Sequence, residues 1–240
     1  MTHEAEQKAV RQARSQGLQV ALAVSLTGIS FGALSVVAGF SVLQTTVLSL
    51  VMFSGASQFA VVGIVGAGGV GAWLPAAMSA GLLGVRNGLY ALRMSPVVGP
   101  GWPKRAVAAQ LTIDESTAVG SAQSSLRAAS AGFWTTGLAV YVGWNSATLG
   151  GALLGDVLGD VSTYGLDAAA AAAFLGLVWP RLREGEPGWV ALGAAMVTIV
   201  LLPAVPPGIP VLVVAVLAIA TALYRHSRSP QRPPREEGSS

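Results

Sequence analysis

The chain has 240 residues, of which 52% are hydrophobic and only 10% are charged. Because soluble domains carry roughly 25% charged residues, this composition excludes a disordered chain and disfavours an ordinary soluble enzyme. The net charge is +3, and the lack of cysteine excludes a disulfide scaffold, a thiol nucleophile and a cysteine-ligated metal. The two histidines, His3 and His226, lie in polar end segments, so we expect no metal site and no cofactor.

Seven segments have the length and character of a membrane span, which needs about 20 mostly apolar residues. In chain order they are Leu18–Phe40, Val47–Ala67, Ala72–Val98, Ala131–Leu154, Val161–Trp179, Gly188–Leu202 and Ile209–Tyr224. Open strands cannot span lipid, because their unpaired backbone groups find no hydrogen bonds there. The predicted fold is therefore all-α, a polytopic membrane helix bundle of about seven spans, with one membrane transport domain at 18–224.

Both ends of the chain are polar and basic. Residues 1–17 contain Lys8, Arg11 and Arg14, and the apolar run after them is too long for a signal peptide, so we interpret it as an uncleaved first span. Residues 225–240 are expected to form a basic, disordered tail. Short basic stretches of this kind indicate cytoplasmic segments rather than a nucleic-acid surface. We therefore predict a multi-pass protein of the cell membrane with both termini in the cytoplasm.

The same charge rule tests the number of crossings. Arg14 and Arg127 are both predicted to be cytoplasmic, yet three predicted spans lie between them. An odd number of crossings cannot return the chain to one side, so either an early span is re-entrant or another segment crosses. The candidate is Ala106–Gln123, about 27 Å long as a helix, with Asp114 and Glu115 in its middle. We interpret it as a crossing or broken helix that lines a protein interior; the alternative is an amphipathic helix at the surface.

Polar residues near the middle of several predicted spans carry the functional signal. Arg86 is central in its span, where an arginine costs about 2.5–3.5 kcal/mol, so it needs a wet cavity or an acidic partner. Polar groups at one depth are what a midplane substrate site requires, although a hydrogen bond between helices is the simpler role for each amide or hydroxyl. The candidate substrate-path residues are Ser54, Ser57, Gln58, Arg86, Asn87 and Asn145, and the proton-coupling candidates are Asp114, Glu115 and Asp167.

Glycine spacing predicts close contacts between helices. The pairs Gly28–Gly32, Gly84–Gly88 and Gly151–Gly155 have the G-x-x-x-G spacing that allows two helices to approach closely. The run Gly63–Gly71 is too rich in glycine for a straight helix, and it predicts a break or a flexible turn.

Four motifs follow one another through most of the membrane domain. They are FSGASQF (Phe53–Phe59), GVRNGLYALRMSP (Gly84–Pro96), LTIDEST (Leu111–Thr117) and YGLDAA (Tyr164–Ala169). In this order they resemble the signature elements of the AzlC family, the large subunit of branched-chain amino acid exporters. The resemblance implies export of leucine, isoleucine or valine. It also implies a partner, a small hydrophobic AzlD-like membrane subunit.

We therefore expect a secondary transporter of branched-chain or similar neutral amino acids, not an enzyme. No G-x-x-x-x-G-K-[ST] loop is present, so an ion gradient is the expected energy source. Asp114 and Glu115 are the natural proton carriers, since carboxylates in low-dielectric surroundings take up protons readily. The alternatives are a non-transporting scaffold or assembly subunit and an exporter of another small solute. An intramembrane hydrolase is disfavoured, because adjacent helical residues point about 100° apart.

Overall fold

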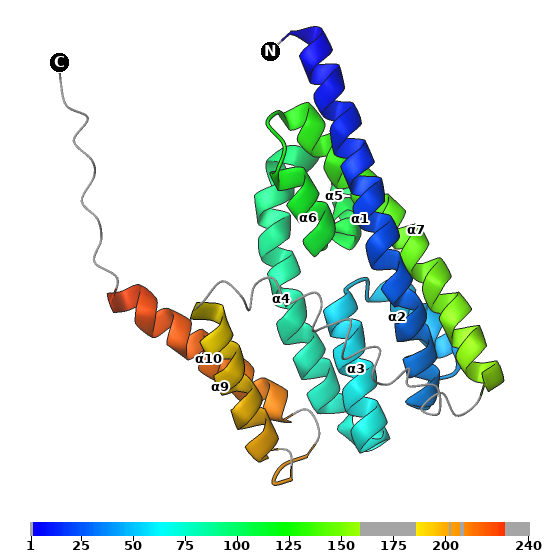
Figure 1. Cartoon of the computed structure of the whole chain (residues 1–240), viewed down its shortest axis with the longest axis vertical. Helices are drawn as coiled ribbons and strands as arrows, with labels where there is room; N and C mark the ends of the chain where they lie inside the picture. The colour runs from blue at the N-terminus through cyan, green and yellow to red at the C-terminus, as the bar shows by residue number, and fades with distance from the viewer. Residues whose placement is uncertain (1, 159–185, 202, 207–208, 229–240) are drawn as a thin grey trace.

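The described part of the chain is helical. The computed structural model describes residues 2–158, 186–201, 203–206 and 209–228, and within these ranges no strand occurs. In chain order the elements are α1 (His3–Val37), α2 (Val42–Val51), α3 (Gly55–Gly68), the 3-10 turn η1 (Val70–Ala72), α4 (Trp73–Val98), α5 (Trp102–Leu111), α6 (Asp114–Ser121), α7 (Leu126–Leu158), α9 (Glu186–Leu201) and α10 (Ile209–Arg228) (Figure 1). The all-helical prediction is confirmed for these residues.

Five of the predicted spans coincide with single helices, namely α1, α4, α7, α9 and α10. The predicted span Val161–Trp179, with the candidate Asp167, lies outside the described residues. Within the described ranges, α1 is the one helix that is both long and apolar enough to cross a membrane by those criteria alone. Only 33% of its most apolar stretch is buried. Most of that apolar surface is therefore not covered by the protein's own core.

Helices α1 and α7 pack side by side along their lengths (Figure 1). A Cβ at Gly28 would lie 2.9 Å from the carbonyl oxygen of Trp144, and one at Gly32 would collide with the backbone of Thr148. Contacts therefore advance along both helices in the same direction, so α1 and α7 run parallel. Only glycine allows backbones to approach so closely, which confirms the predicted contact at Gly28–Gly32.

The other two glycine pairs differ from each other. A Cβ at Gly151 would collide with the backbone of Ile29, and one at Gly155 would lie 3.1 Å from Ala33, so this pair also joins α7 to α1. By contrast, nothing among the described residues lies within 4 Å of a Cβ built at Gly88. The Gly84–Gly88 spacing therefore does not form a tight helix contact in this part of the chain.

The prediction of a single span over Val47–Ala67 is wrong. α2 ends at Val51 and α3 begins at Gly55, with Ser54 in an extended conformation before it. The physical reason is that polar side chains from distant elements bind the carbonyl groups at the end of α2, as described below, so the helix can stop there without leaving them unpaired.

Helix α3 returns toward the end from which α2 started. Thr45 in α2 donates a hydrogen bond to Ser35, near the end of α1, at 2.9 Å. Gly66, near the end of α3, faces Ala38, just beyond the end of α1. We call α2 and α3 the first hairpin. It occupies the lower half of the helical body in Figure 1, beside α4.

The polar segment Ala106–Gln123, interpreted from the sequence as a crossing or broken helix, is broken. α5 ends at Leu111 and α6 begins at Asp114. A Cβ at Gly137 of α7 would meet Leu111, whereas one at Gly120 of α6 would meet Phe133, one turn nearer the start of α7. α6 therefore runs back toward the start of α7, and α5 with α6 forms a second hairpin in the upper half of the body (Figure 1).

The two hairpins account for the odd number of predicted spans. α1 and α7 begin at the same end, where Glu6 and Arg127 form an ion pair at 3.8 Å. Between them α4 alone carries the chain from one end to the other, because each hairpin folds back on itself. Of the two explanations for the odd count, a segment that folds back instead of crossing is the one that the structure supports.

The glycine-rich run Gly63–Gly71 and the C-terminal tail were also predicted from the sequence. The break expected within Gly63–Gly71 occurs at Gly69, whose φ of +63° is accessible to glycine at little cost. η1 follows and leads into α4. At the other end, α10 continues to Arg228, so the first residues of the predicted tail are helical and 229–240 lie outside the described residues.

Candidate functional site

The breaks of the two hairpins lie next to each other. Gln110, at the end of α5, donates from Nε2 to the carbonyl oxygens of Leu50 at 2.9 Å and Val51 at 3.3 Å, at the end of α2. Tyr141 of α7 donates from its hydroxyl to the same Leu50 carbonyl at 3.2 Å. The last carbonyls of a helix have no partner within it, so these bonds stabilise the end of α2. The second hairpin and α7 are thereby tied to the first.

Sequence reasoning missed Gln110 and Tyr141. The available signal was the polar Gln110 at the end of the mostly apolar stretch 106–111. Its partners are 59 and 60 residues away in the chain, so no local pattern identifies them.

Gln58 is fully buried at the first break. Its Nε2 donates to the carbonyl oxygens of Ser49 at 3.3 Å and Met52 at 2.5 Å, and its Oε1 accepts from the indole Nε1 of Trp144 at 3.0 Å. The amide therefore replaces backbone partners that the break removes, and both of its polar ends are engaged inside the protein. Phe31 covers Trp144 with a stacked ring at 6.1 Å between centroids.

The other polar candidates at the first break also bond within the protein. Ser54 donates from Oγ to Ser57 Oγ at 3.2 Å, and Ser57 donates from Oγ to the carbonyl of Ala80 in α4 at 3.0 Å. Asn145 donates from Nδ2 to Tyr141 of its own helix at 2.7 Å. Its buried Oδ1 has no hydrogen-bond partner among the described residues. The bond from Ser57 to Ala80 joins α3 to α4, and Oδ1 of Asn145 remains on α7 as an acceptor without a described partner.

The second break carries an ion pair. Arg86 of α4 lies with Nη2 2.7 Å from Oδ2 of Asp114, the first residue of α6, and the two side chains are 36% and 41% exposed. Of the two adjacent carboxylates Asp114 and Glu115, Asp114 is the one that forms the ion pair with Arg86. Ser116 fixes the break by accepting from Ile113 N at 3.1 Å and donating to the Leu111 carbonyl at 2.7 Å.

Three buried polar atoms near this ion pair have no hydrogen-bond partner among the described residues. They are Nε of Arg86 itself, Oδ1 of the adjacent Asn87, and Oγ1 of Thr117, one turn after Asp114. A buried polar atom without a partner costs roughly 1–3 kcal/mol, and Oγ of Ser49, in α2, is another such atom. Glu115 is half-buried beside them.

The structure thus separates the predicted site residues into two groups. Ser54, Ser57 and Gln58 belong to the first break, whereas Arg86, Asn87, Asp114 and Glu115 belong to the second, and Asn145 lies on α7 one turn after Tyr141. Asp167 lies outside the described residues. Among the residues that the structure describes, no group of three or more His, Asp or Glu side chains is placed to hold a metal ion.

A comparison with known protein families matches residues 19–158 to the AzlC protein family. This match spans more than half of the chain and includes both hairpins. The chain belongs to the AzlC family. Membership implies a membrane protein with a transport-related function, because AzlC proteins are transporter-associated and not an enzyme family. No curated protein and no solved structure matches the chain.

Proposed function

We propose that this AzlC-family chain is a secondary transporter that exports branched-chain or similar neutral amino acids, and that it works with a small AzlD-like subunit in the cell membrane. The observation that carries the proposal is the half-exposed Arg86–Asp114 pair at the broken end of α6, where buried polar atoms lack partners. The substrate class and the partner are carried over from the family resemblance.

The lengths of the helices support a multi-pass arrangement with the breaks at mid-depth. α1, α4 and α7 have 35, 26 and 33 residues, more than the roughly 20 that a span needs. The hairpin helices α2 and α5 have 10 residues each, about 15 Å. That is half of a hydrocarbon core about 30 Å thick. α9 and α10 would add two further crossings.

An amino acid backbone matches the chemistry of the second break. Its carboxylate would bind the guanidinium of Arg86, which offers several N–H donors in one plane. Its ammonium would bind Asp114. Binding would then replace the Arg86–Asp114 ion pair by two ion pairs between the protein and the substrate. A neutral side chain on the substrate would add no further charge that needs a partner.

The carboxylate of Asp114 suggests how a proton gradient drives export. If Asp114, or Glu115 next to it, holds either the substrate's ammonium or a proton but never both, release of one accompanies binding of the other. Protons entering the cell would then be exchanged for amino acid leaving it. A transporter of this kind needs no nucleotide and no bound metal.

Efflux of preloaded radiolabelled leucine, valine and methionine from cells tests the proposal. The chain is expressed with and without an AzlD-like subunit, and the Arg86→Ala variant is run beside each. We expect the chain to accelerate efflux and the Arg86→Ala variant to abolish this acceleration. Comparison of cells with and without the AzlD-like subunit shows whether the chain exports on its own. Unchanged efflux of all three substrates, with both proteins present in the membrane, would contradict the proposal. It would favour a scaffold subunit or another solute.

A further inference from the structure

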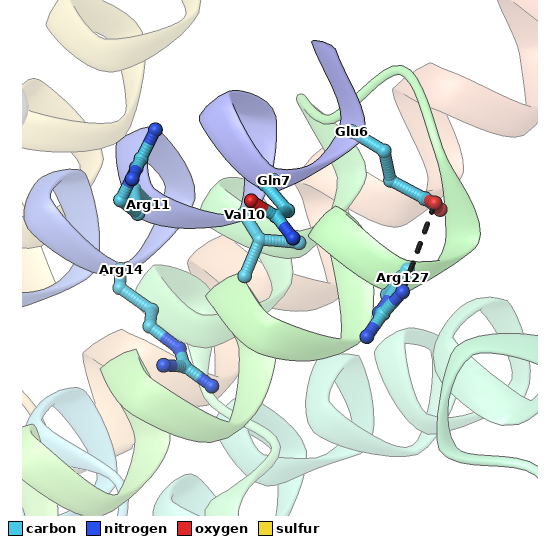
Figure 2. Close-up of a pocket in the computed structure, with 6 residues that line it drawn as sticks. All are labelled: Glu6, Gln7, Val10, Arg11, Arg14 and Arg127. Carbon is cyan, nitrogen blue, oxygen red and sulfur yellow. Dashed lines mark ion pairs between the residues drawn. The ribbon is translucent and has the colours of Figure 1, made fainter. Parts of the chain in front are cut away.

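A groove lined by arginines lies where α1 and α7 begin. It has a volume of about 310 Å³ and is lined by Glu6, Gln7, Val10, Arg11, Arg14 and Arg127. Figure 2 shows Gln7 and Val10 between Arg14 and Arg127, with Arg11 at one edge and Glu6 at the other. None of these residues belongs to the site at the breaks.

Positive charge exceeds negative charge in this groove. Glu6 is the one acidic residue among those that line it, and it pairs with Arg127 at 3.8 Å. This distance is longer than that of a close charge-assisted hydrogen bond, about 2.7–2.9 Å. Arg127 keeps 67% of its side chain exposed. Arg11 and Arg14 are also exposed, so the groove holds guanidinium groups that are free to bind an anion.

Apolar side chains continue from the groove along the outer face of α1. Leu18, Leu22 and Leu26 are 56%, 70% and 60% exposed. They follow Arg14 at intervals of one turn, and residues at this spacing share one face of a helix. This face therefore changes from basic to apolar over one turn, as expected where a helix enters a membrane.

Helix α7 repeats this arrangement beside α1. Leu138, Val142 and Leu149 are 49%, 64% and 40% exposed, and their spacing of four and seven residues places them on one face. Arg127 lies eleven residues before Leu138, about three turns, and so on that same face. Two parallel helices thus each place an arginine at the groove and an apolar stripe after it.

We propose that this groove binds the phosphate headgroup of an anionic phospholipid of the cytoplasmic leaflet, with the acyl chains lying along the two apolar stripes. Guanidinium groups bind phosphate through paired N–H donors, and basic pockets between membrane helices on the cytoplasmic side are suited to anionic headgroups. A free phosphate would satisfy the arginines but would not use the stripes. The lipid matches both features.

Native mass spectrometry of the purified full-length chain in detergent tests this proposal. The wild-type chain is mixed with phosphatidylglycerol, phosphatidylcholine or inorganic phosphate, and the Arg14→Gln, Arg127→Gln and Lys8→Gln variants are compared with it. Lys8 is a matched control because it is exposed on α1 but does not line the groove. We expect retention of phosphatidylglycerol over phosphatidylcholine, reduced about fivefold by each groove arginine removed and less than about twofold for Lys8→Gln.

Three results would overturn the proposal. Equal retention of the two lipids by the wild-type chain would show that the groove does not select an anionic headgroup. An equal loss for Lys8→Gln would show general attraction to a basic surface and not a site. Displacement of phosphatidylglycerol by millimolar inorganic phosphate would show that the acyl chains add nothing. The exposed Arg11→Gln variant serves as a second test if Arg127→Gln fails to fold.

Discussion

The two hairpins share a backbone arrangement but differ in the chemistry of their breaks. In the first hairpin the break is occupied by Gln58, which is fully buried and bonded to Ser49, Met52 and Trp144. In the second the break carries the half-exposed pair of Arg86 and Asp114. A broken helix is therefore not in itself a binding site. What distinguishes the second break is charge that remains accessible.

This difference assigns separate roles to the two hairpins. The first break is neutral and its principal amide is satisfied internally, so we expect its substitution to change stability. The second break holds charges that remain partly exposed, so we expect its substitution to change transport.

The largest effect is expected for Arg86→Ala. The change removes the partner of Asp114 and the proposed partner of the substrate's carboxylate. A hydrogen bond to a charged group contributes about 1.5–3 kcal/mol, so leucine efflux should fall about tenfold or more. Arg93→Ala is the matched control on the same helix, because Arg93 is exposed and donates only to Ser121 in the described structure. Equal efflux for the two variants, at equal amounts in the membrane, would remove the assigned role of Arg86.

The next effect concerns the coupling carboxylates. In the double variant Asp114→Asn and Glu115→Gln, neither side chain can exchange a proton, so an inward proton gradient should no longer accelerate leucine efflux. The measurement is efflux with and without an imposed gradient in membrane vesicles. Full acceleration in this variant would show that the coupling ion binds elsewhere.

Gln58→Leu tests the first hairpin. The change leaves the Ser49 and Met52 carbonyls and the Trp144 N–H without the partner they have now, and each such loss costs about 1–3 kcal/mol. We expect a clear fall in the melting temperature of the purified chain, with little change in efflux per folded molecule. Gln19→Leu on the exposed face of α1 is the control. An unchanged melting temperature together with lost efflux would place Gln58 in the substrate path instead.

The smallest effect is expected for Tyr141→Phe. It removes one partly exposed hydrogen bond, to the Leu50 carbonyl, while Gln110 continues to bind that carbonyl. The expected loss in the free energy of unfolding is about 0.5–1.5 kcal/mol, measured by thermal unfolding. A loss several times larger would show that α7, and not the second hairpin, holds the first break in place.

The sequence offered a break as one of two interpretations of the second hairpin and treated 47–67 as continuous, for a physical reason. Asp114 and Glu115 interrupt an otherwise helical stretch with charge, which hydropathy detects directly. The stretch 47–67 carries no charged residue. Its break is stabilised by Gln58, 6 and 9 residues from its backbone partners, and by side chains 59 to 91 residues away. Such bonds form only when the chain has folded, so the local pattern resembles a continuous span.

The candidate site shows the same limit. The energetic cost of an arginine at mid-span predicted either a wet cavity or an acidic partner, and the structure shows an acidic partner, Asp114. The sequence did not distinguish Gln58 from Arg86 as candidates, because both are polar residues near the middle of predicted spans. Only the bonding partners show that one is satisfied within the protein while the other retains an unpaired Nε.

Protection of single cysteines by leucine tests directly whether the substrate binds at the second break and not at the first, since the chain has no cysteine of its own. Ala118→Cys places a thiol on an exposed position of α6 one turn after Asp114, and Gly63→Cys places one on an exposed position of α3 in the first hairpin. We expect leucine to slow the labelling of Ala118→Cys by a membrane-permeant thiol reagent and to leave the labelling of Gly63→Cys unaffected. Equal labelling of both variants with and without leucine, while efflux continues, would contradict it.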